Sequence, residues 1–194
     1  MDGTLADHQR DAGMIDPASA SKTILETPRL RIRAFTVEDA PFAYELVNDP
    51  DWIRNIGDRN VRTLEDARGY LERGPIAMQE KCGFSLFAVV LKESGATIGM
   101  CGLIRREILE DVDIGFAFLP AYRGQGYALE SAQAVMDHAW GALGLTRLVA
   151  IVAPGNAPSI RLLTSLGFTF ERMMRLPNDD EDLRFYGLAR PASS

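Results

Sequence analysis

A ten-residue stretch, AYRGQGYALE at positions 121–130, combines residue types that could bind a phosphate group. Gly124 and Gly126 lie two positions apart, Arg123 precedes them, and an apolar-periodic segment that predicts a helix follows. Glycines at a helix N-terminus let the backbone approach a ligand closely, and the unpaired N–H groups there carry a positive charge of roughly half a unit. The pattern therefore predicts a turn that holds an anion, with Arg123 as an additional cation.

Several glycine patterns could explain this turn. A dinucleotide-binding fingerprint requires a small residue where Leu129 stands, and it usually follows the first strand of a chain. This also argues against a nicotinamide-dependent oxidoreductase. A P-loop requires Gly-Lys-Ser/Thr after the glycines, which the stretch lacks. The spacing Arg-x-x-Gly-x-Ala, formed by Arg123, Gly126 and Ala128, remains, beside the plain alternative of a helix that begins with capping glycines.

The segments that position this turn alternate between strand and helix patterns. Strands are predicted at 27–35, 83–93, 96–106, 111–119, 147–153, 168–175 and 182–190, and helices at 36–48, 63–79, 126–143 and 156–167. The order indicates a mixed α/β fold, because one helix leads into a parallel neighbouring strand. We expect a single domain over 24–194 behind a flexible leader at 1–23.

Composition excludes several classes of protein. The 194 residues are 46% hydrophobic and 25% charged, as in one ordinary globular domain. The formal net charge of -6 disfavours general nucleic-acid binding, which needs clustered Lys and Arg. No apolar run reaches the ~20 residues of a membrane span, and the polar N-terminal stretch lacks a secretory pattern. The sequence therefore predicts a cytoplasmic protein without nucleic-acid or membrane partners.

The cysteines and histidines show neither a disulfide framework nor a metal site. Cys82 and Cys101 lie in apolar, strand-like surroundings, which predicts buried and reduced thiols. His8 lies in the expected leader and His138 lies in a helical pattern. Because no His and Cys residues have the spacing of metal ligands, we predict that the protein binds no metal.

A second motif, NAPSIRLLTSLGFTFE at 156–171, extends the observation on the glycine turn. The order and spacing of the two motifs make residues 27–190 resemble the GCN5-related N-acetyltransferase (GNAT) superfamily. The resemblance is strongest to its ribosomal-protein N-terminal acetyltransferase (RimJ/RimL-like) branch. It implies a mostly antiparallel sheet of about seven strands, splayed in the middle and flanked by about four helices. It also implies an enzyme that transfers an acetyl group from acetyl-CoA to a primary amine.

The resemblance implies where acetyl-CoA binds. The pantetheine arm would pair with the strand before the turn like an added strand, and the turn itself would hold the diphosphate. Asn156 would contact the pantetheine, and Arg161 would meet CoA phosphates together with Arg123. The implied cofactor-binding residues are Phe116, Ala117, Phe118, Arg123, Gly124, Gln125, Gly126, Tyr127, Ala128, Asn156 and Arg161.

The resemblance also implies the catalytic groups. Acetyl transfer requires a neutral amine, a stabilised oxyanion and a proton for the departing thiolate. Many family members supply that proton from a tyrosine where this chain has Leu163, so the branch implies Ser159 instead. Glu171 matches the base of the branch, and Asp113 is the competing carboxylate. Arg172 replaces a glycine that is usual in the branch, a departure that bears on the acceptor more than on the base.

The resemblance implies that the acceptor is a primary amine, either a protein N-terminus or a small molecule such as an amino sugar, polyamine or amino acid. An α-amine with a pKa of ~8 is partly neutral at pH 7, whereas a lysine near 10.4 needs more help. Loops 48–62 and 176–183 are expected to wall the acceptor site, with Trp52 and Asp179–Asp182 as candidates. Direct transfer is expected; the alternative is a CoA-binding module with little catalysis. The sequence leaves monomer and homodimer open.

Overall fold

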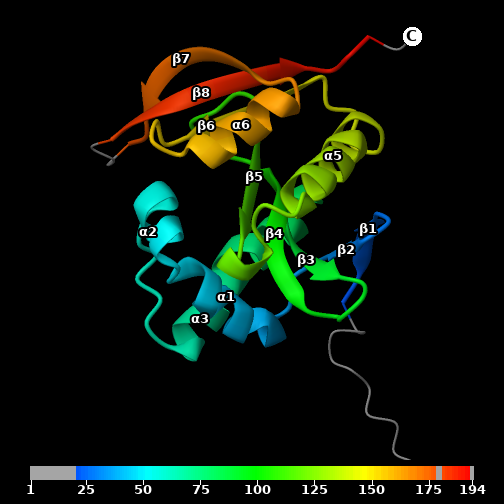
Figure 1. Ribbon diagram of the computed structural model, residues 1–194, viewed down its shortest axis with the longest axis vertical. Coiled ribbons are helices and arrows are strands. Elements are labelled where there is room, and N and C mark those ends of the chain that lie inside the picture. Colours follow the sequence, from blue (N-terminus) through cyan, green and yellow to red (C-terminus); the bar gives the residue numbers. More distant parts are fainter. Residues whose placement is uncertain (1–20, 178–180, 193–194) are drawn as a thin grey trace, which may run out of the picture.

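One eight-stranded sheet forms the centre of the computed structural model, which describes residues 21–177 and 181–192 (Figure 1). The strand order is β1-β2-β3-β4-β5-β6-β8-β7, and every pairing is antiparallel except that of β5 with β6. The predicted mixed α/β, mostly antiparallel sheet is thus confirmed. The strands are β1 (Thr23–Glu26), β2 (Leu30–Arg33), β3 (Leu86–Leu91), β4 (Thr97–Ile104), β5 (Val112–Phe118), β6 (Arg147–Val152), β7 (Thr169–Arg175) and β8 (Asp182–Ala189).

The sheet has one strand more than predicted because residues 23–26, ahead of the predicted strand 27–35, form β1 and pair with β2. A turn at Thr27 separates β1 from β2: its N–H donates to the Leu30 carbonyl at 2.9 Å, and its hydroxyl accepts from the Leu30 N–H at 2.9 Å. Thr23 already belongs to β1, one residue before the expected domain boundary. The rest of the expected leader, 1–20, lies outside the described residues.

Helices cover both faces of the sheet. On one face α5 and α6 pack against residues such as Leu148 and Ile114, and on the other α1, α2 and α3 pack against Ala88 and Met100. The α-helices of the described chain are α1 (Ala40–Val47), α2 (Pro50–Ile56), α3 (Leu64–Leu71), α4 (Ala77–Cys82), α5 (Tyr127–Trp140) and α6 (Ala157–Ser165). None of the helices in this part of the chain is both long and apolar enough to cross a bilayer.

Three helix predictions needed correction. The expected loop 48–62 contains α2, which begins because the Asp49 carboxylate accepts two helix N–H groups and Pro50 occupies the first position. The expected single helix 63–79 is divided into α3 and α4. Pro75 has no N–H to donate, and the chain widens into a π-helical turn at Glu72–Ile76. The helix expected to reach position 143 ends at Trp140.

The middle of the sheet is splayed, as the resemblance implied. β5 pairs with β6 only at Val112 and Asp113, whereas its pairing with β4 continues to Phe118. Residues 114–118 therefore have no strand partner on the β6 side. A wedge-shaped gap therefore opens between β5 and β6, and it leaves the backbone of β5 at 114–118 unpaired on that side.

Candidate active site

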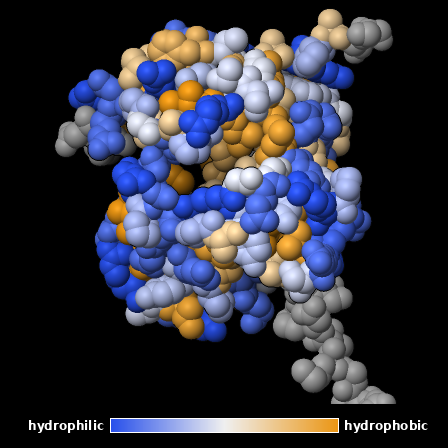
Figure 2. All heavy atoms as spheres, viewed as in Figure 1, coloured by the Kyte–Doolittle hydropathy of each residue, from blue (hydrophilic) through white to orange (hydrophobic). Residues whose placement is uncertain are grey.

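Two cavities meet at the wedge. One, the glycine-turn cleft, has a volume of about 660 Å³ and is lined by the 123–128 segment and the start of α6. The other, the Asp113 cavity, has a volume of about 540 Å³ and is lined by α2, β5, β6 and the start of α6. In the view of Figure 2, the surface of the molecule is hollowed near its centre. Both cavities are lined by Trp52, Arg54, Asn55, Ile56, Phe116, Ala117, Asn156 and Ser159.

The glycine turn requires its glycines for backbone reasons. Gly124 has φ +72° and Gly126 has φ +82°, in the left-handed region that side chains disfavour. Gly126 is also the N-cap of α5, so the first free N–H groups of that helix follow it directly. The turn therefore presents helix N–H groups to the cleft, as predicted from the sequence, through a conformation that the motif alone did not reveal.

The structure gathers nearly all predicted cofactor-binding residues along the glycine-turn cleft. Gln125 is the exception: its side chain donates to the Ala121 carbonyl at 2.8 Å, and its own carbonyl accepts from Arg29 at 3.0 Å. The residues that line the cleft are Phe116, Ala117, Phe118, Arg123, Gly124, Gly126, Tyr127, Ala128, Asn156 and Arg161.

Sequence reasoning missed Arg29 as a support of this turn. Its guanidinium lies 4.5 Å from the centre of the Tyr127 ring, and its Nε donates to Glu130 in the first turn of α5 at 2.6 Å. No local pattern could have revealed the contact, since Arg29 and Glu130 are 101 residues apart. The start of α5 is therefore braced from the β1–β2 connection.

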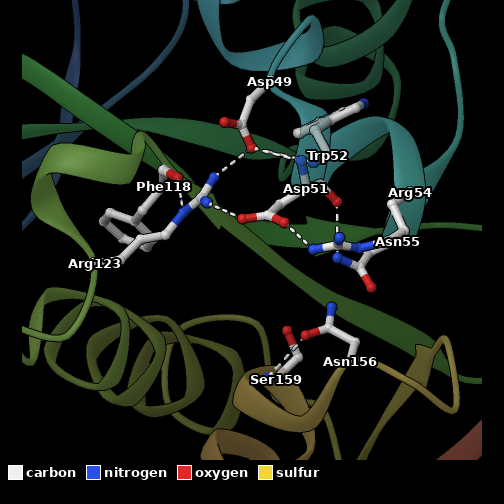
Figure 3. A network of polar contacts seen from close by, with 9 residues as sticks. All are labelled: Asp49, Asp51, Trp52, Arg54, Asn55, Phe118, Arg123, Asn156 and Ser159. Atoms are coloured by element: carbon white, nitrogen blue, oxygen red, sulfur yellow. Dashed lines mark hydrogen bonds and ion pairs between the residues drawn. The ribbon is translucent and has the colours of Figure 1, made fainter.

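Arg123 is not the free cation that the sequence predicted. Its Nε donates to the Phe118 carbonyl at 2.8 Å, and its two terminal nitrogens each lie 2.6 Å from a carboxylate oxygen of Asp49 or Asp51 (Figure 3). Burial would raise the pKa of Asp49, but hydrogen bonds from Arg123 and the Trp52 N–H outweigh it, and the pKa is lowered. All three guanidinium nitrogens thus have protein acceptors.

Arg161, by contrast, is available to a ligand. It lies on the exposed side of α6 at the rim of the glycine-turn cleft. Within residues 21–177 and 181–192 it has no ion-pair partner. Of the two predicted phosphate-binding arginines, the structure leaves this one free.

The start of α6 forms the junction of the two cavities. Asn156 is the N-cap, and its side-chain oxygen accepts the Ser159 N–H at 3.2 Å. This bond involves the backbone of Ser159, and no residue of the described chain forms a hydrogen bond with its hydroxyl group. Leu163, one turn further on, is buried and lines the Asp113 cavity. Ser159 is therefore the hydroxyl residue of α6 that lines both cavities.

Asp113 is the buried carboxylate of the site. Its Oδ2 accepts a hydrogen bond from the Nε of Arg106 at 2.6 Å, and its side chain lines the Asp113 cavity. Burial raises the pKa of Asp113 to about 6, against the opposing charge and hydrogen bond of Arg106. A carboxyl group with this pKa is mostly ionised at neutral pH and can still accept a proton.

Glu171 lies elsewhere. It lines neither cavity; its Oε1 accepts from Arg147 at 2.6 Å, and Arg147 also bonds Asp111 at 2.9 Å. This cluster lies at the first residue of β6, whereas the cavities open at the other end of that strand. The structure thus separates the two candidate bases and brings only Asp113 to the site.

The walls of the Asp113 cavity agree in part with the expected acceptor loops. Trp52 is 5% exposed and lines both cavities. From the second loop Glu181 contributes, whereas Asp182 pairs with Arg175 at 2.8 Å outside the lining. Asp179 and Asp180 fall outside the described residues. Arg59 and Leu183, which lie within the two expected loops, also line this cavity. Sequence reasoning missed lining residues outside those loops, among them Tyr70 and Arg106.

The cysteines lie apart from both cavities. Cys101 is buried, as expected, and burial raises the pKa of its thiol to about 12. Cys82 is only half-buried at the end of α4, a correction to the expected burial. Neither thiol forms a disulfide.

Comparisons with known proteins agree with this geometry. The "Acetyltransferase (GNAT) domain" family model matches residues 29–169. The chain is 30% identical over 159 residues to the uncharacterized N-acetyltransferase YnaD of Bacillus subtilis, covering 81% of this chain and 90% of that protein.

Solved structures give the same fold. A GNAT-family acetyltransferase from Bacillus anthracis superposes with a TM-score of 0.70 at 27% identity, covering 87% of this chain and 97% of that one. RimL, a ribosomal L7/L12 alpha-N-protein acetyltransferase in complex with coenzyme A, superposes with a TM-score of 0.74 at 21% identity, covering 87% and 98%. The chain belongs to the GNAT family of acetyltransferases.

Proposed function

We propose that the protein holds acetyl-CoA in the glycine-turn cleft and an amine in the Asp113 cavity, and that the acetyl group passes directly between them. The observation that carries this proposal is the meeting of the two cavities at Asn156 and Ser159. Two substrates bound on either side of that junction are brought into contact, which removes the entropy cost of a bimolecular encounter. A covalent enzyme intermediate is then unnecessary.

The residues of the glycine-turn cleft fit the parts of CoA. The turn offers unpaired helix N–H groups to a diphosphate, and Arg161 adds a free positive charge. The open edge of β5 at 114–118 offers backbone groups to the amides of pantetheine, in the manner of an added strand. RimL, which shares the fold, has been solved with coenzyme A.

Within the junction we assign two proton-transfer roles. Asp113 accepts a proton from the incoming amine, because of the two candidate bases it is the one that lines the cavity and its pKa of about 6 suits a base at neutral pH. Ser159 donates a proton to the departing thiolate, because it is the hydroxyl residue of α6 that lines both cavities. The proton that Asp113 takes from the amine returns through solvent to the Ser159 oxygen, so that amide and free thiol are the net products. Glu171 is the weaker candidate for the base, since Arg147 holds it outside the cavities.

For the acceptor we propose a primary amine, either a protein α-amine or a small molecule. The lower pKa of an α-amine favours it over a lysine side chain when a single carboxylate serves as base. RimL is described as an alpha-N-protein acetyltransferase, and the shared fold is consistent with such an acceptor.

We place the reaction in the cytoplasm, where the free thiols of Cys82 and Cys101 would stay reduced. The protein is proposed to act as a monomer or homodimer.

An acceptor panel tests the function. The purified protein is incubated with acetyl-CoA and peptides with free N-termini, amino acids, amino sugars or polyamines, while free CoA and the acetylated product are measured. We expect CoA release that requires one class of amine, with one acetylated amine formed per thiol. If no amine promotes thiol release although CoA binds, the protein is a CoA-binding module instead.

A further inference from the structure

Helix α2 forms a wall shared by the two cavities. It is a seven-residue helix, and Trp52, Arg54, Asn55 and Ile56 on it line both the glycine-turn cleft and the Asp113 cavity. A shift of this helix would therefore change the shape of the Asp113 cavity and of the adjoining side of the glycine-turn cleft. The backbone groups of the cleft at 123–128 and at the start of α6 belong to other elements and would stay in place.

Few apolar contacts fix α2 to the body of the protein. Trp52 is its one buried residue among those described, whereas Ile53 and Ile56 are each 41% exposed. A short helix with a single buried side chain has little packing energy to hold its position, because helix stability in proteins comes mainly from a packed apolar face. Its placement must then depend on its polar contacts.

Arg123 supplies those contacts. From the segment between β5 and α5 it pairs with Asp49 and with Asp51, each at 2.6 Å. The Asp49 oxygen that it contacts also accepts the N–H groups of Asp51 and Trp52, so the same group both caps α2 and accepts from Arg123 (Figure 3). Planar guanidinium groups are suited to bridging several acceptors at once.

The third contact of Arg123 fixes the other end of the link. Its Nε donates to the carbonyl of Phe118, the last residue of β5, at 2.8 Å. Gly124 of the glycine turn follows Arg123 directly. One side chain thus ties the end of β5 and the start of the glycine turn to the first turn of α2.

We propose that Arg123 is a positioning residue that holds α2 as a wall of the Asp113 cavity, rather than a ligand of the CoA diphosphate. The assignment of that cavity to the amine rests on the proposed function. Loss of Arg123 then loosens α2 and weakens use of the amine, while the backbone groups and Arg161 continue to hold CoA. Arg123, although part of the glycine motif of the CoA site, would then support binding of the amine.

Amide hydrogen exchange tests the link without relying on activity. Residues 51–57 are compared in the parent, Arg123→Gln and Arg161→Gln, the last being a matched loss of one charge at the same cleft, and CoA affinity is measured by calorimetry. We expect Arg123→Gln to speed exchange in α2 by about tenfold and to change the CoA Kd by less than about threefold. Arg161→Gln should leave exchange in α2 as in the parent and should weaken CoA binding about threefold at low salt. Unchanged α2 exchange together with a CoA Kd at least tenfold weaker in Arg123→Gln would overturn the proposal.

Two further measurements separate positioning from general damage. Asp51→Asn attacks the link from the other side, and its effect on α2 exchange should not add to that of Arg123→Gln. With the panel amine that releases most CoA, Arg123→Gln should raise the amine KM about tenfold and the acetyl-CoA KM less than about threefold. A larger rise in the acetyl-CoA KM would refute the assignment. If no amine is acetylated, the proposed function fails, and the exchange experiment still decides the role of Arg123.

Discussion

The glycine-turn cleft and the Asp113 cavity adjoin each other but are built differently. The cleft depends on backbone groups from one continuous stretch, 123–128, and from the first turn of α6. The Asp113 cavity depends on side chains from α2, α3 and β4 to β6, together with the segment before β8. A site of backbone groups needs residues with special conformations, which are visible in sequence. A site of side chains needs distant elements placed correctly, which leaves no local pattern.

The largest effect should come from Asp113→Asn, on the side-chain half of the comparison. A base works when ionised, so parent kcat/KM for the amine should show a step as the pH increases through about 6, the pKa of Asp113, in addition to the rise toward ~8 that comes from the amine itself. The variant should lose this step and about 10²- to 10³-fold in rate at pH 7. Glu171→Gln is the control and should stay within about twofold of the parent. Rate–pH profiles of the parent and both variants measure these effects. A large loss in Glu171→Gln and a small one in Asp113→Asn would show that Glu171 is the base.

Ser159→Ala acts at the junction, where the two halves of the site meet. The loss of a proton donor to the thiolate should lower kcat by about 10²-fold, near the low end for acid–base groups because water can substitute. The acetyl-CoA Kd should hardly change. Ser165→Ala, near the other end of the same helix, is the matched control and should behave like the parent. Equal turnover in both variants would exclude Ser159 as the acid.

Gly126→Ala tests the backbone half. A side chain at φ +82° costs about 1–2 kcal/mol and its Cβ would lie 3.3 Å from the Arg29 guanidinium, so the turn should shift. Acetyl-CoA affinity should fall about tenfold, or 1.4 kcal/mol, by calorimetry. Gly144→Ala has a similar conformational cost at φ +64° with open space around it, away from the cleft. If both variants lose thermal stability but keep the parent affinity for acetyl-CoA, the glycine turn does not hold the cofactor.

The smallest effect should come from Arg161→Ala. CoA affinity in the parent should decrease between about 0.05 and 0.5 M salt, because an exposed cation meets phosphate charges that salt screens. The variant should bind CoA about threefold more weakly at low salt and should show a flatter salt dependence. A parent Kd that does not respond to salt would show that the backbone alone holds the diphosphate.

Sequence reasoning succeeded where local rules apply. The glycine turn, the helix that begins after Asn156 and the strands β3 and β4 each follow from short patterns with a known conformational reason. The turn at Thr27 and the helix α2 also had local signals, a threonine side chain and an Asp-Pro-Asp start, but competing strand and loop patterns hid them.

The remaining differences depend on partners far along the chain. Arg123 meets Asp49 across 74 residues, and Glu171 meets Arg147 across 24, so neither ion pair could be inferred from spacing. Asp113 was considered as a base, yet its burial and its raised pKa depend on β4 and β6 lying on either side of it. A motif predicts which charged side chains the site region contains. Contacts between distant segments determine which of those side chains remain available to a substrate.

The most direct test of direct transfer between the two cavities is an initial-rate study in which acetyl-CoA and the panel amine are varied together. Two substrates bound at once on either side of Ser159 predict intersecting double-reciprocal lines, and intact-protein mass spectrometry should find no acetylated enzyme after incubation with acetyl-CoA alone. Parallel lines together with a stable acetyl-enzyme would contradict the account, because the acetyl group would then pass through the protein before it reaches the amine.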